Sequence, residues 1–404
     1  MKHENGTVTA EALPFSTAFP ALLLMTALFY VNFMARISLA PLLPAIEHDL
    51  GFSHGESGAL FLLVSAGYFI TVIFSGCISS RIKHRGTIIF SALFLGLILL
   101  GIALSSSLLV LRAGMFLVGA SAGFYLPSGI ATLTSLINAR DWGKAIAIHE
   151  LAPNLGFVTV PIVCEILLIQ LSWRGIIGLL GIISIAIGIA FIFLGKGGNF
   201  YGQAPSLAAS RTLFSVPAFW IMVALFGLGI TGSLGIFSML PLYLVAERGI
   251  EREWANTLIA FSRLSGLFMA FVSGWVNDRL GPRKTLVGVM GFSGLSTLCL
   301  AVVPEKLLVV LLFVQPAAAV CFFPPAFTAL ARVGPPATRN ISVSYTVPLG
   351  FLFGGGLAPI AIGTMGDIWS FSLGIGLFGL LILCGIMLAA RLKLSSPETK
   401  PENR

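Results

Sequence analysis

Long apolar runs separated by short polar breaks dominate this chain. Within each run the hydrophobic residues are continuous, and each run approaches the ~20 residues that a helix needs to cross a bilayer. Backbone in lipid must satisfy its own hydrogen bonds, so runs of this length without alternation predict helices. About twelve runs qualify, with approximate limits 18–46, 58–79, 87–107, 109–137, 145–171, 175–195, 217–246, 255–277, 285–303, 307–331, 341–365 and 369–390.

Composition agrees with a chain that lies mostly in lipid. Hydrophobic residues make up 57% of the 404 residues and charged residues only 10%, against ~25% charged in an ordinary soluble domain. The mean hydropathy is +0.98. The predicted fold class is therefore all-α membrane protein, and the first run is too long for a cleavable signal peptide.

Basic residues predict the orientation of the spans. With the N-terminus inside, the cytoplasmic segments hold 17 of the 24 Lys and Arg residues, the outer loops hold Arg174, Arg248, Arg252 and Lys306, and three lie within the membrane. This bias obeys the positive-inside rule. We expect a multi-pass protein of a plasma membrane, such as the bacterial inner membrane, with both termini cytoplasmic. The net charge of +8 reflects this topology, so it indicates no nucleic-acid partner.

A spacing of 198 residues divides the chain into two similar halves. Five residues recur at this offset: Gly76, Arg81, Pro127, Gly156 and Pro161 return as Gly274, Arg279, Pro325, Gly354 and Pro359. We predict a tail at 1–14, six-helix halves at 15–195 and 215–392, a cytoplasmic linker at 196–214 and a tail at 393–404. Parallel halves with a site between them are common in secondary transporters, and a monomer is adequate for this architecture.

A loop motif follows the eighth run and resembles a family signature. It contains Gly274, Asp278, Arg279, Gly281 and Arg283 in the pattern G-x-x-x-D-R-x-G-x-R-K, which is similar to the cytoplasmic loop motif of the major facilitator superfamily. The resemblance implies twelve helices, alternating access and secondary transport, with a central cavity lined by spans 1, 2, 4, 5, 7, 8, 10 and 11. Asp278 would latch the cytoplasmic side by accepting from a helix N-terminus or an arginine.

The first-half copy of this motif is degraded. Arg81 and Arg85 remain, but Ser80 replaces the aspartate and Lys83 replaces the glycine. Both arginines are assigned to gating together with the residues of the second copy. Because only the second copy has the acidic partner, a two-fold symmetric latch is not expected.

Five formally charged residues lie well inside runs: Arg36, Arg112, Glu150, Glu165 and Arg263. None of them recurs at the offset of 198, whereas the glycines and prolines of the scaffold do. A charge in the bilayer interior costs at least ~2.5 kcal/mol, so each needs a compensating reason. They fall in spans 1, 4, 5 and 8, which supports a polar cavity.

Arg263 is the main candidate for binding substrate. It lies nine residues past Trp254, or ~13.5 Å along a helix, near the bilayer midplane, and no acid lies within a turn. Its planar fork suits a carboxylate. Arg36 shares a face with Asn32, and the predicted binding set is completed by Tyr125, Asn256 and Arg112. Arg112 is shallow enough to snorkel, so a structural role is the alternative there.

The fifth span carries a polar stripe. Glu150, Asn154, Phe157, Pro161 and Glu165 lie within about 80° of one another on a helix. His149 precedes Glu150, and a buried carboxylate beside a histidine can exchange a proton near neutral pH. We assign proton coupling to Glu150, His149, Glu165 and Asn154. The alternative is that Glu165 neutralises Arg112 and Glu150 neutralises another basic group.

Three arginines against two glutamates leave the predicted cavity positive by one. This favours an anionic small molecule, a carboxylate above all, moved by proton symport, and an eighth-span arginine is similar to the organic-anion carriers of the monocarboxylate and oxalate group. The alternative is proton-coupled efflux of amphiphilic drugs, favoured by Gly156, Pro161 and the 32 phenylalanines.

The residues favour a carrier over an enzyme. No H-E-x-x-H occurs, and the five cysteines have no metal-ligand spacing, so free thiols packed as small hydrophobes are expected. We predict no metal and no cofactor, with the proton as coupling ion and the bilayer and a small anion as partners.

Overall fold

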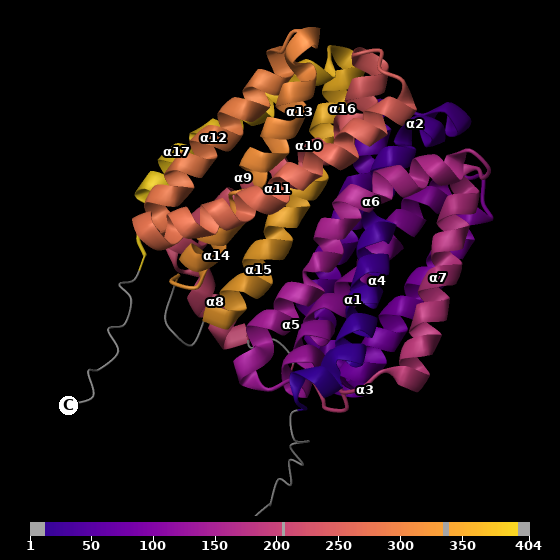
Figure 1. Ribbon diagram of the computed structural model, residues 1–404, viewed down its shortest axis with the longest axis vertical. Coiled ribbons are helices and arrows are strands. Elements are labelled where there is room, and N and C mark those ends of the chain that lie inside the picture. The colour runs from indigo at the N-terminus through magenta and orange to yellow at the C-terminus, as the bar shows by residue number, and fades with distance from the viewer. Residues whose placement is uncertain (1–12, 204–206, 334–338, 395–404) are drawn as a thin grey trace, which may run out of the picture.

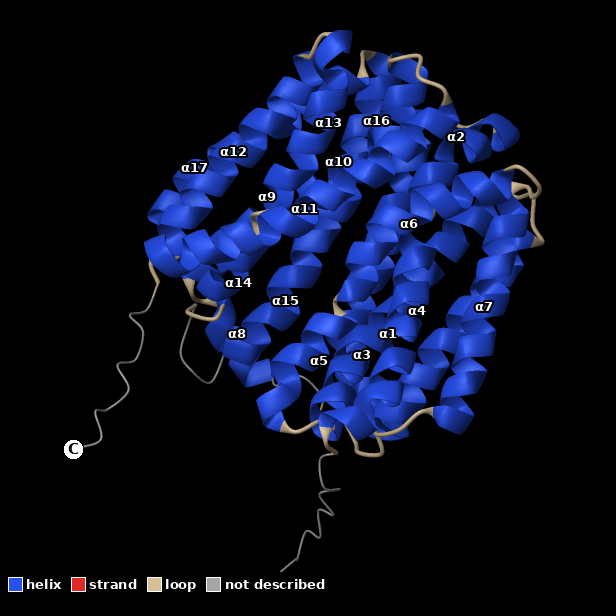
Figure 2. Ribbon diagram, in the orientation of Figure 1, coloured by secondary structure: helices blue, strands red, loops and turns tan. Residues whose placement is uncertain are grey.

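A computed structural model describes residues 13–203, 207–333 and 339–394 of the chain, and within them it contains helices and no strand (Figures 1 and 2). The first half holds α1 Phe15–Ile37, α2 Leu39–Leu50, α3 His54–Ala103, α4 Leu108–Leu136, the 3₁₀ turn η1 Ala139–Asp141, α5 Trp142–His149, α6 Leu151–Leu168 and α7 Trp173–Leu194. The remainder holds α8 Leu207–Phe214, α9 Pro217–Ile230, η2 Thr231–Gly235, α10 Ile236–Leu242, η3 Tyr243–Glu247, α11 Arg252–Leu280, α12 Pro282–Val302, α13 Glu305–Val320, α14 Phe323–Leu330, α15 Arg339–Phe351, η5 Leu352–Leu357, α16 Ala358–Ile368 and α17 Phe371–Arg391.

Eleven stretches of the described residues are long and apolar enough to cross a membrane. One of them, α3, has 50 residues and contains a kink at Lys83, where the backbone leaves the helical region at φ 64° and ψ 164°. Each arm of α3 is long enough for a span of its own, since a helix rises 1.5 Å per residue. Counting the arms separately gives 11 + 1, the twelve spans predicted from the sequence.

The two halves repeat their polar contacts as well as their sequence. The Arg85 guanidinium donates to the Ile192 carbonyl at 2.8 Å, and the Arg283 guanidinium donates to the Ala390 carbonyl, so donor and acceptor are both shifted by 198 residues. Each arginine satisfies carbonyls at the end of the last helix of its own half, where the helix has none of its own donors left.

A second pair of contacts repeats at the other end of the same helices. The Asp49 carboxylate accepts from the indole of Trp173 at 3.1 Å, and the Glu247 carboxylate accepts from the backbone N–H of Phe371. Both pairs are again related by 198 residues. In each half, an acid at the end of the first span binds the start of the last span.

The halves pack against each other through α2 with α10, α3 with α16 and α6 with α11, and α3 also contacts η5 and α15. The halves approach closely at Gly363, where an added Cβ would lie 2.2 Å from the carbonyl oxygen of His54. Figure 1 shows α2 and α16 at the end of the molecule opposite to α8. We call the α8 end the linker face and the α2 end the opposite face.

The connection between the halves packs on the linker face of the first half. Backbone N–H groups of His84 and Arg85 donate to the carbonyls of Phe200 and Gly198, and the Lys83 ammonium lies 5.2 Å from the centre of the Tyr201 ring. The degraded copy of the loop motif therefore holds the connection, which also contains the short helix α8.

Candidate functional site

Arg263 lies between the halves, buried at 6% exposure in the middle of α11. Its guanidinium donates to the carbonyl of Ser233 at 2.8 Å and lies 4.8 Å from the ring centre of Phe157 and 4.6 Å from that of Phe237. Its Nε has no hydrogen-bond partner among the described residues. A cation between two aromatic faces is stabilised without being neutralised, so this guanidinium can still accept an anion.

The carbonyl that holds Arg263 belongs to η2, a π-helical segment of the seventh span. The neighbouring carbonyl of Gly232 accepts from the buried amide of Gln315 at 2.8 Å. π-helical segments interrupt the normal ladder and are frequent at functional sites. The sequence gives no signal for η2 beyond its two glycines, Gly232 and Gly235.

Arg36 lies in the first half with the same kind of surroundings. Its guanidinium lies 4.7 Å from the ring centre of Tyr68 and 5.2 Å from that of Phe33, and its buried Nε has no partner among the described residues. Asn32, one turn away, is buried and reaches the Ala122 carbonyl at 3.5 Å, which directs its amide toward α4.

Aromatic rings connect the two arginines. Phe33, beside Arg36, lies 5.1 Å from Phe157 between ring centres, and Phe157 lies beside Arg263. A small cavity of about 30 Å³ borders Arg36 and is lined from both halves, by Ser65 and Tyr68 on one side and Leu234 and Gly355 on the other. The structure thus brings Arg36 and Arg263 to one aromatic seam between the halves.

Arg112 is placed elsewhere. It pairs with Glu56 at 2.5 Å, and both side chains are about two-fifths exposed, at 41% and 39%. The predicted binding role for Arg112 is therefore not supported, because Glu56 neutralises it at the edge of the opposite face. The S-x-x-E pattern of Ser53 and Glu56, which forms a capping box at the start of α3, was the signal in the sequence that could have located Glu56.

Glu165 and Asn256 also lie toward the opposite face and join the halves there. The Glu165 carboxylate accepts from Arg252 at 3.1 Å and from the Asn256 amide at 2.6 Å. The same amide lies 3.3 Å from the Pro41 carbonyl. The alternative that Glu165 neutralises Arg112 is wrong, since its partner is Arg252, 87 residues along the chain. Glu165 and Asn256 therefore connect the two halves near the opposite face, and neither lines the cavity beside Arg36.

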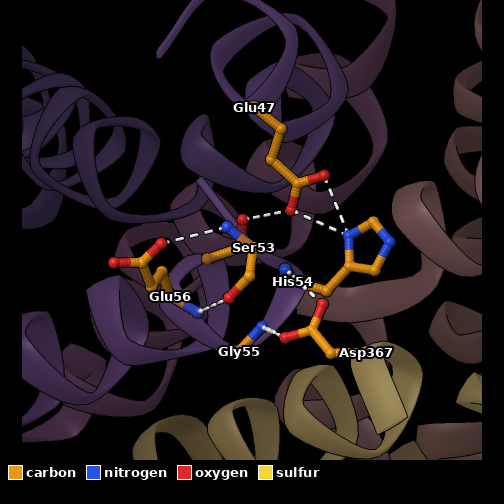
Figure 3. Close-up of polar contacts among 7 residues, drawn as sticks. Glu47, Ser53, His54, Gly55, Glu56 and Asp367 are labelled. Carbon is orange, nitrogen blue, oxygen red and sulfur yellow. Dashed lines mark hydrogen bonds and ion pairs between the residues drawn. The ribbon is translucent and has the colours of Figure 1, made fainter. Parts of the chain in front are cut away.

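A second contact closes the opposite face, as Figure 3 shows. The Asp367 carboxylate, from α16, accepts from the backbone N–H groups of His54 and Gly55 at 2.9 and 2.7 Å. These are first-turn donors of α3 without helical partners, and the positive end of the helix favours the carboxylate. The His54 ring in turn contacts the Glu47 carboxylate at 2.9 Å. A second acid therefore helps to position the residue whose backbone binds Asp367.

The proton-coupling candidates occupy the break between α5 and α6. His149 is fully buried and stacks on Phe29 with ring centres 4.5 Å apart. Its Nδ1 lies 3.4 Å from the Glu150 carboxylate, and its Nε2 lies 3.1 Å from the Tyr125 hydroxyl. Glu150 is 45% exposed, so it connects a buried imidazole with accessible space. Among the described residues no lysine or arginine pairs with Glu150, whose carboxylate contacts His149 instead.

Two other predicted residues take supporting places around this group. Tyr125 is 1% exposed and donates to the Met25 carbonyl at 2.6 Å, which turns it toward His149 rather than toward Arg36. Asn154 is exposed and donates to the Glu150 carbonyl at 2.9 Å. Asn154 therefore stabilises the backbone beside the break.

A larger cavity of about 240 Å³ lies toward the linker face. Residues of both halves and of the connection line it, including Ser75, Ser79, His84, Gln203 and Tyr345. The halves are therefore joined by polar contacts at the opposite face and separated by a cavity toward the linker face.

The predicted gating residues do not bridge the halves in this state. Arg85 and Arg283 bind helix ends of their own halves, and the Arg279 guanidinium stacks 4.0 Å from the Trp275 ring. Arg81 and Asp278 are exposed, and among the described residues Asp278 forms no ion pair.

The glycines of the motif have two different surroundings. Gly281 has φ 78° at the end of α11, a conformation that favours glycine. Gly274 has open space where a Cβ would be.

Comparisons with known proteins give one family and one fold. A model of the Major Facilitator Superfamily matches residues 22–306 and 255–404. A probable L-galactonate transporter of Escherichia coli is 24% identical over 282 residues, 64% of this chain and 61% of the relative. A probable sulfoacetate transporter of Cupriavidus necator is 21% identical, covering 69% and 70%, and the multidrug resistance protein MdtL of a Shewanella species is 21% identical, covering 61% and 63%. The match thus spans about three fifths of the length of the first of these relatives.

Solved structures show the same fold at low identity. A bacterial homolog of the human lysosomal transporter Spinster, in an inward-facing and unoccupied conformation, superposes with a TM-score of 0.77 at 15% identity, over 93% of this chain and 95% of that one. A D-xylose-proton symporter superposes with a TM-score of 0.76 at 14% identity, over 93% and 97%.

Proposed function

Since the chain belongs to the Major Facilitator Superfamily, a family of multi-pass membrane transport proteins rather than enzymes, we propose that it is a secondary transporter of a small organic anion, driven by proton symport. The observation that carries this proposal is the pair of interior arginines. Arg36 and Arg263 both lie against aromatic rings, and neither forms an ion pair with an acid of the described residues.

The charge balance at the seam favours an anion. Arg112 is neutralised by Glu56 and Glu165 by Arg252, which leaves two arginines against Glu150. Two unneutralised guanidiniums in a medium of low dielectric constant attract a negative group strongly. An arginine offers a planar fork that a carboxylate or sulfonate can accept. Two of the relatives carry the names of organic acids, L-galactonate and sulfoacetate.

The cycle would alternate between two closures. In the present state Asp367 and Glu165 close the opposite face, and the cavity of about 240 Å³ opens the seam toward the linker face. If the linker face is cytoplasmic, as the basic residues predict, this is a state that releases substrate to the cell interior. Breaking the contacts of Asp367 and Glu165 would open the other side.

Proton-coupled efflux of amphiphilic drugs is the second candidate. The aromatic seam of Phe33, Phe157 and Phe237 would suit such compounds, and a multidrug resistance protein is among the relatives. The two arginines argue against cationic drugs, because a like charge beside them costs free energy.

Counterflow in proteoliposomes tests the proposal. A panel of labelled sugar acids, sulfonated acids and monocarboxylates is compared with lipophilic cations. Saturable exchange of at least one acid and of no cation supports anion transport. Exchange of lipophilic cations and of no acid would contradict anion transport and support drug efflux.

A further inference from the structure

One hydrogen bond fixes the tautomer of His149. The Tyr125 hydroxyl has a single hydrogen and lies 2.6 Å from the carbonyl oxygen of Met25, which can only accept. Two oxygens at that distance need a hydrogen between them, so Tyr125 donates to Met25. The His149 Nε2 lies 3.1 Å from the same hydroxyl oxygen. Because Tyr125 has no second hydrogen to donate, its oxygen accepts from Nε2, and Nε2 must carry a hydrogen.

With Nε2 protonated, the other ring nitrogen faces Glu150. The Nδ1 of His149 lies 3.4 Å from a carboxylate oxygen of Glu150. If neither Nδ1 nor the carboxylate carried a proton, the lone pair of Nδ1 would face a negatively charged oxygen, which is a repulsive contact. One proton converts this contact into a hydrogen bond, held either by the carboxyl group or by the imidazolium. A second proton at this contact would leave both Nδ1 and the carboxyl oxygen protonated, so neither could accept the hydrogen bond.

We infer that Tyr125 is a positioning residue that locks His149 in the Nε2–H form, so that His149 and Glu150 together bind one exchangeable proton. The inference deepens the proposed symport and rests on it for the role of that proton in transport. Its geometric part, the tautomer, is independent of transport.

Aromatic rings cover the imidazole of this pair. The ring of His149 is covered by Phe29 of α1 and Tyr125 of α4, both nearly parallel to it at 8°. Tyr68 of α3 and Tyr125 interact electrostatically with Glu150, and the Arg36 guanidinium lies 4.7 Å from the ring centre of Tyr68. Only Glu150 is accessible, at 45% exposure, so protons enter and leave through its carboxylate.

Substrate can affect this pair through Arg36. That guanidinium lies 4.7 Å from the Tyr68 ring, and Tyr68 is in electrostatic range of Glu150. An anion on Arg36 reduces the positive potential there, which favours the protonated pair. Loading with anion and with proton would therefore reinforce each other, as symport requires.

Nitrogen NMR of the full chain in lipid bilayers reads the tautomer directly. The protein is labelled with ¹⁵N-histidine, and the His149 signals are those that vanish in His149→Gln. From about pH 5 to about pH 9, Nε2 should keep its hydrogen while Nδ1 alone responds to pH. An Nδ1–H form with bare Nε2 at any pH in this range would overturn the inference.

Transport assays test the positioning role with a matched pair of variants. Tyr125→Phe removes the acceptor for Nε2. Tyr30→Phe is the control. It removes a partly buried hydroxyl of α1 that is hydrogen-bonded to Thr159 of α6 at 2.5 Å. We expect Tyr125→Phe to reduce pH-driven accumulation about tenfold, as for the loss of one buried hydrogen bond, with counterflow preserved. Tyr30→Phe should preserve both activities.

The outcomes separate the two proposals. Full pH-driven accumulation by Tyr125→Phe would overturn its positioning role. If the wild-type protein shows no pH-driven accumulation, proton symport fails, and the NMR result still decides the tautomer of His149.

Discussion

Lys83 and Gly281, 198 residues apart, share one unusual backbone conformation. Their φ angles are 64° and 78°, and their ψ angles are 164° and 160°. This region suits glycine and strains any residue with a Cβ. The fold therefore demands the same turn between spans 2 and 3 as between spans 8 and 9, although only the second copy has the glycine.

The first prediction follows from that strain. Lys83→Gly should raise the free energy of unfolding by about 1 kcal/mol, because it relieves the positive φ. The gain is reduced by loss of the Lys83 contact with Tyr201. Gly281→Lys should lower it by about 1–3 kcal/mol. Thermal unfolding in detergent compares the two variants, and a more stable Gly281→Lys protein would refute the strain.

The second prediction concerns Arg263. Arg263→Lys keeps the charge but loses the planar fork and the fit between Phe157 and Phe237, so the Kd for the transported acid should rise about tenfold or more. Titration calorimetry on purified protein measures it. Arg140→Lys, at a side chain that is 80% exposed, is the control and should bind normally. Normal transport by Arg263→Ala would exclude a binding role.

The third prediction separates Arg112 from the site. Arg112→Gln should retain the Kd for substrate and change stability by no more than about 1 kcal/mol, because its ion pair with Glu56 is partly exposed. Glu56→Gln breaks the same pair and should behave alike. Loss of binding in Arg112→Gln with normal binding in Glu56→Gln would restore Arg112 to the binding set.

The fourth prediction concerns closure of the opposite face. Gly363→Ala introduces a Cβ 2.2 Å from the His54 carbonyl oxygen, so α3 and α16 cannot pack as they do here. Spin labels on Ser106 and Lys306, exposed residues of opposite halves, should move apart. Gly288→Ala, where a Cβ meets nothing within 4 Å, is the control. An unchanged distance distribution in Gly363→Ala would show that the seam tolerates the methyl group.

The sequence predicted the fold well because a bilayer leaves few choices. Apolar length alone locates the spans, and the offset of 198 anticipates contacts such as Arg85 with Ile192 and Arg283 with Ala390. The kink in α3 could be located only through the motif copy, since lysine gives no local signal for a positive φ.

The site was predicted only in part, because partners in a helical bundle are distant in sequence. Arg36 and Arg263 were found by their charge in apolar runs. The partner of Arg112 is 56 residues away, and that of Glu165 is 87, so helical spacing could not show either pair. Tyr125 was assigned to substrate because the sequence cannot show that its hydroxyl points to Met25 and His149.

The fifth prediction separates coupling from folding at Glu150. Glu150→Gln gives a permanently neutral side chain that mimics the proton-loaded carrier, so exchange of the acid should persist. Its amide can still contact the Nδ1 of His149, so we expect normal expression and stability. A variant that misfolds would instead indicate that Glu150 neutralises a basic partner.

Accumulation of the labelled acid in proteoliposomes, with an acidic exterior and the membrane potential held at zero, tests the central claim most directly. We predict that the wild-type protein accumulates the acid in proportion to the pH gradient, and that Glu150→Gln exchanges it without accumulating it. Equal pH-driven accumulation by wild-type and a well-folded Glu150→Gln protein would contradict coupling through Glu150. Absence of any gradient-driven uptake of acids by the wild-type protein would contradict proton-coupled anion transport itself.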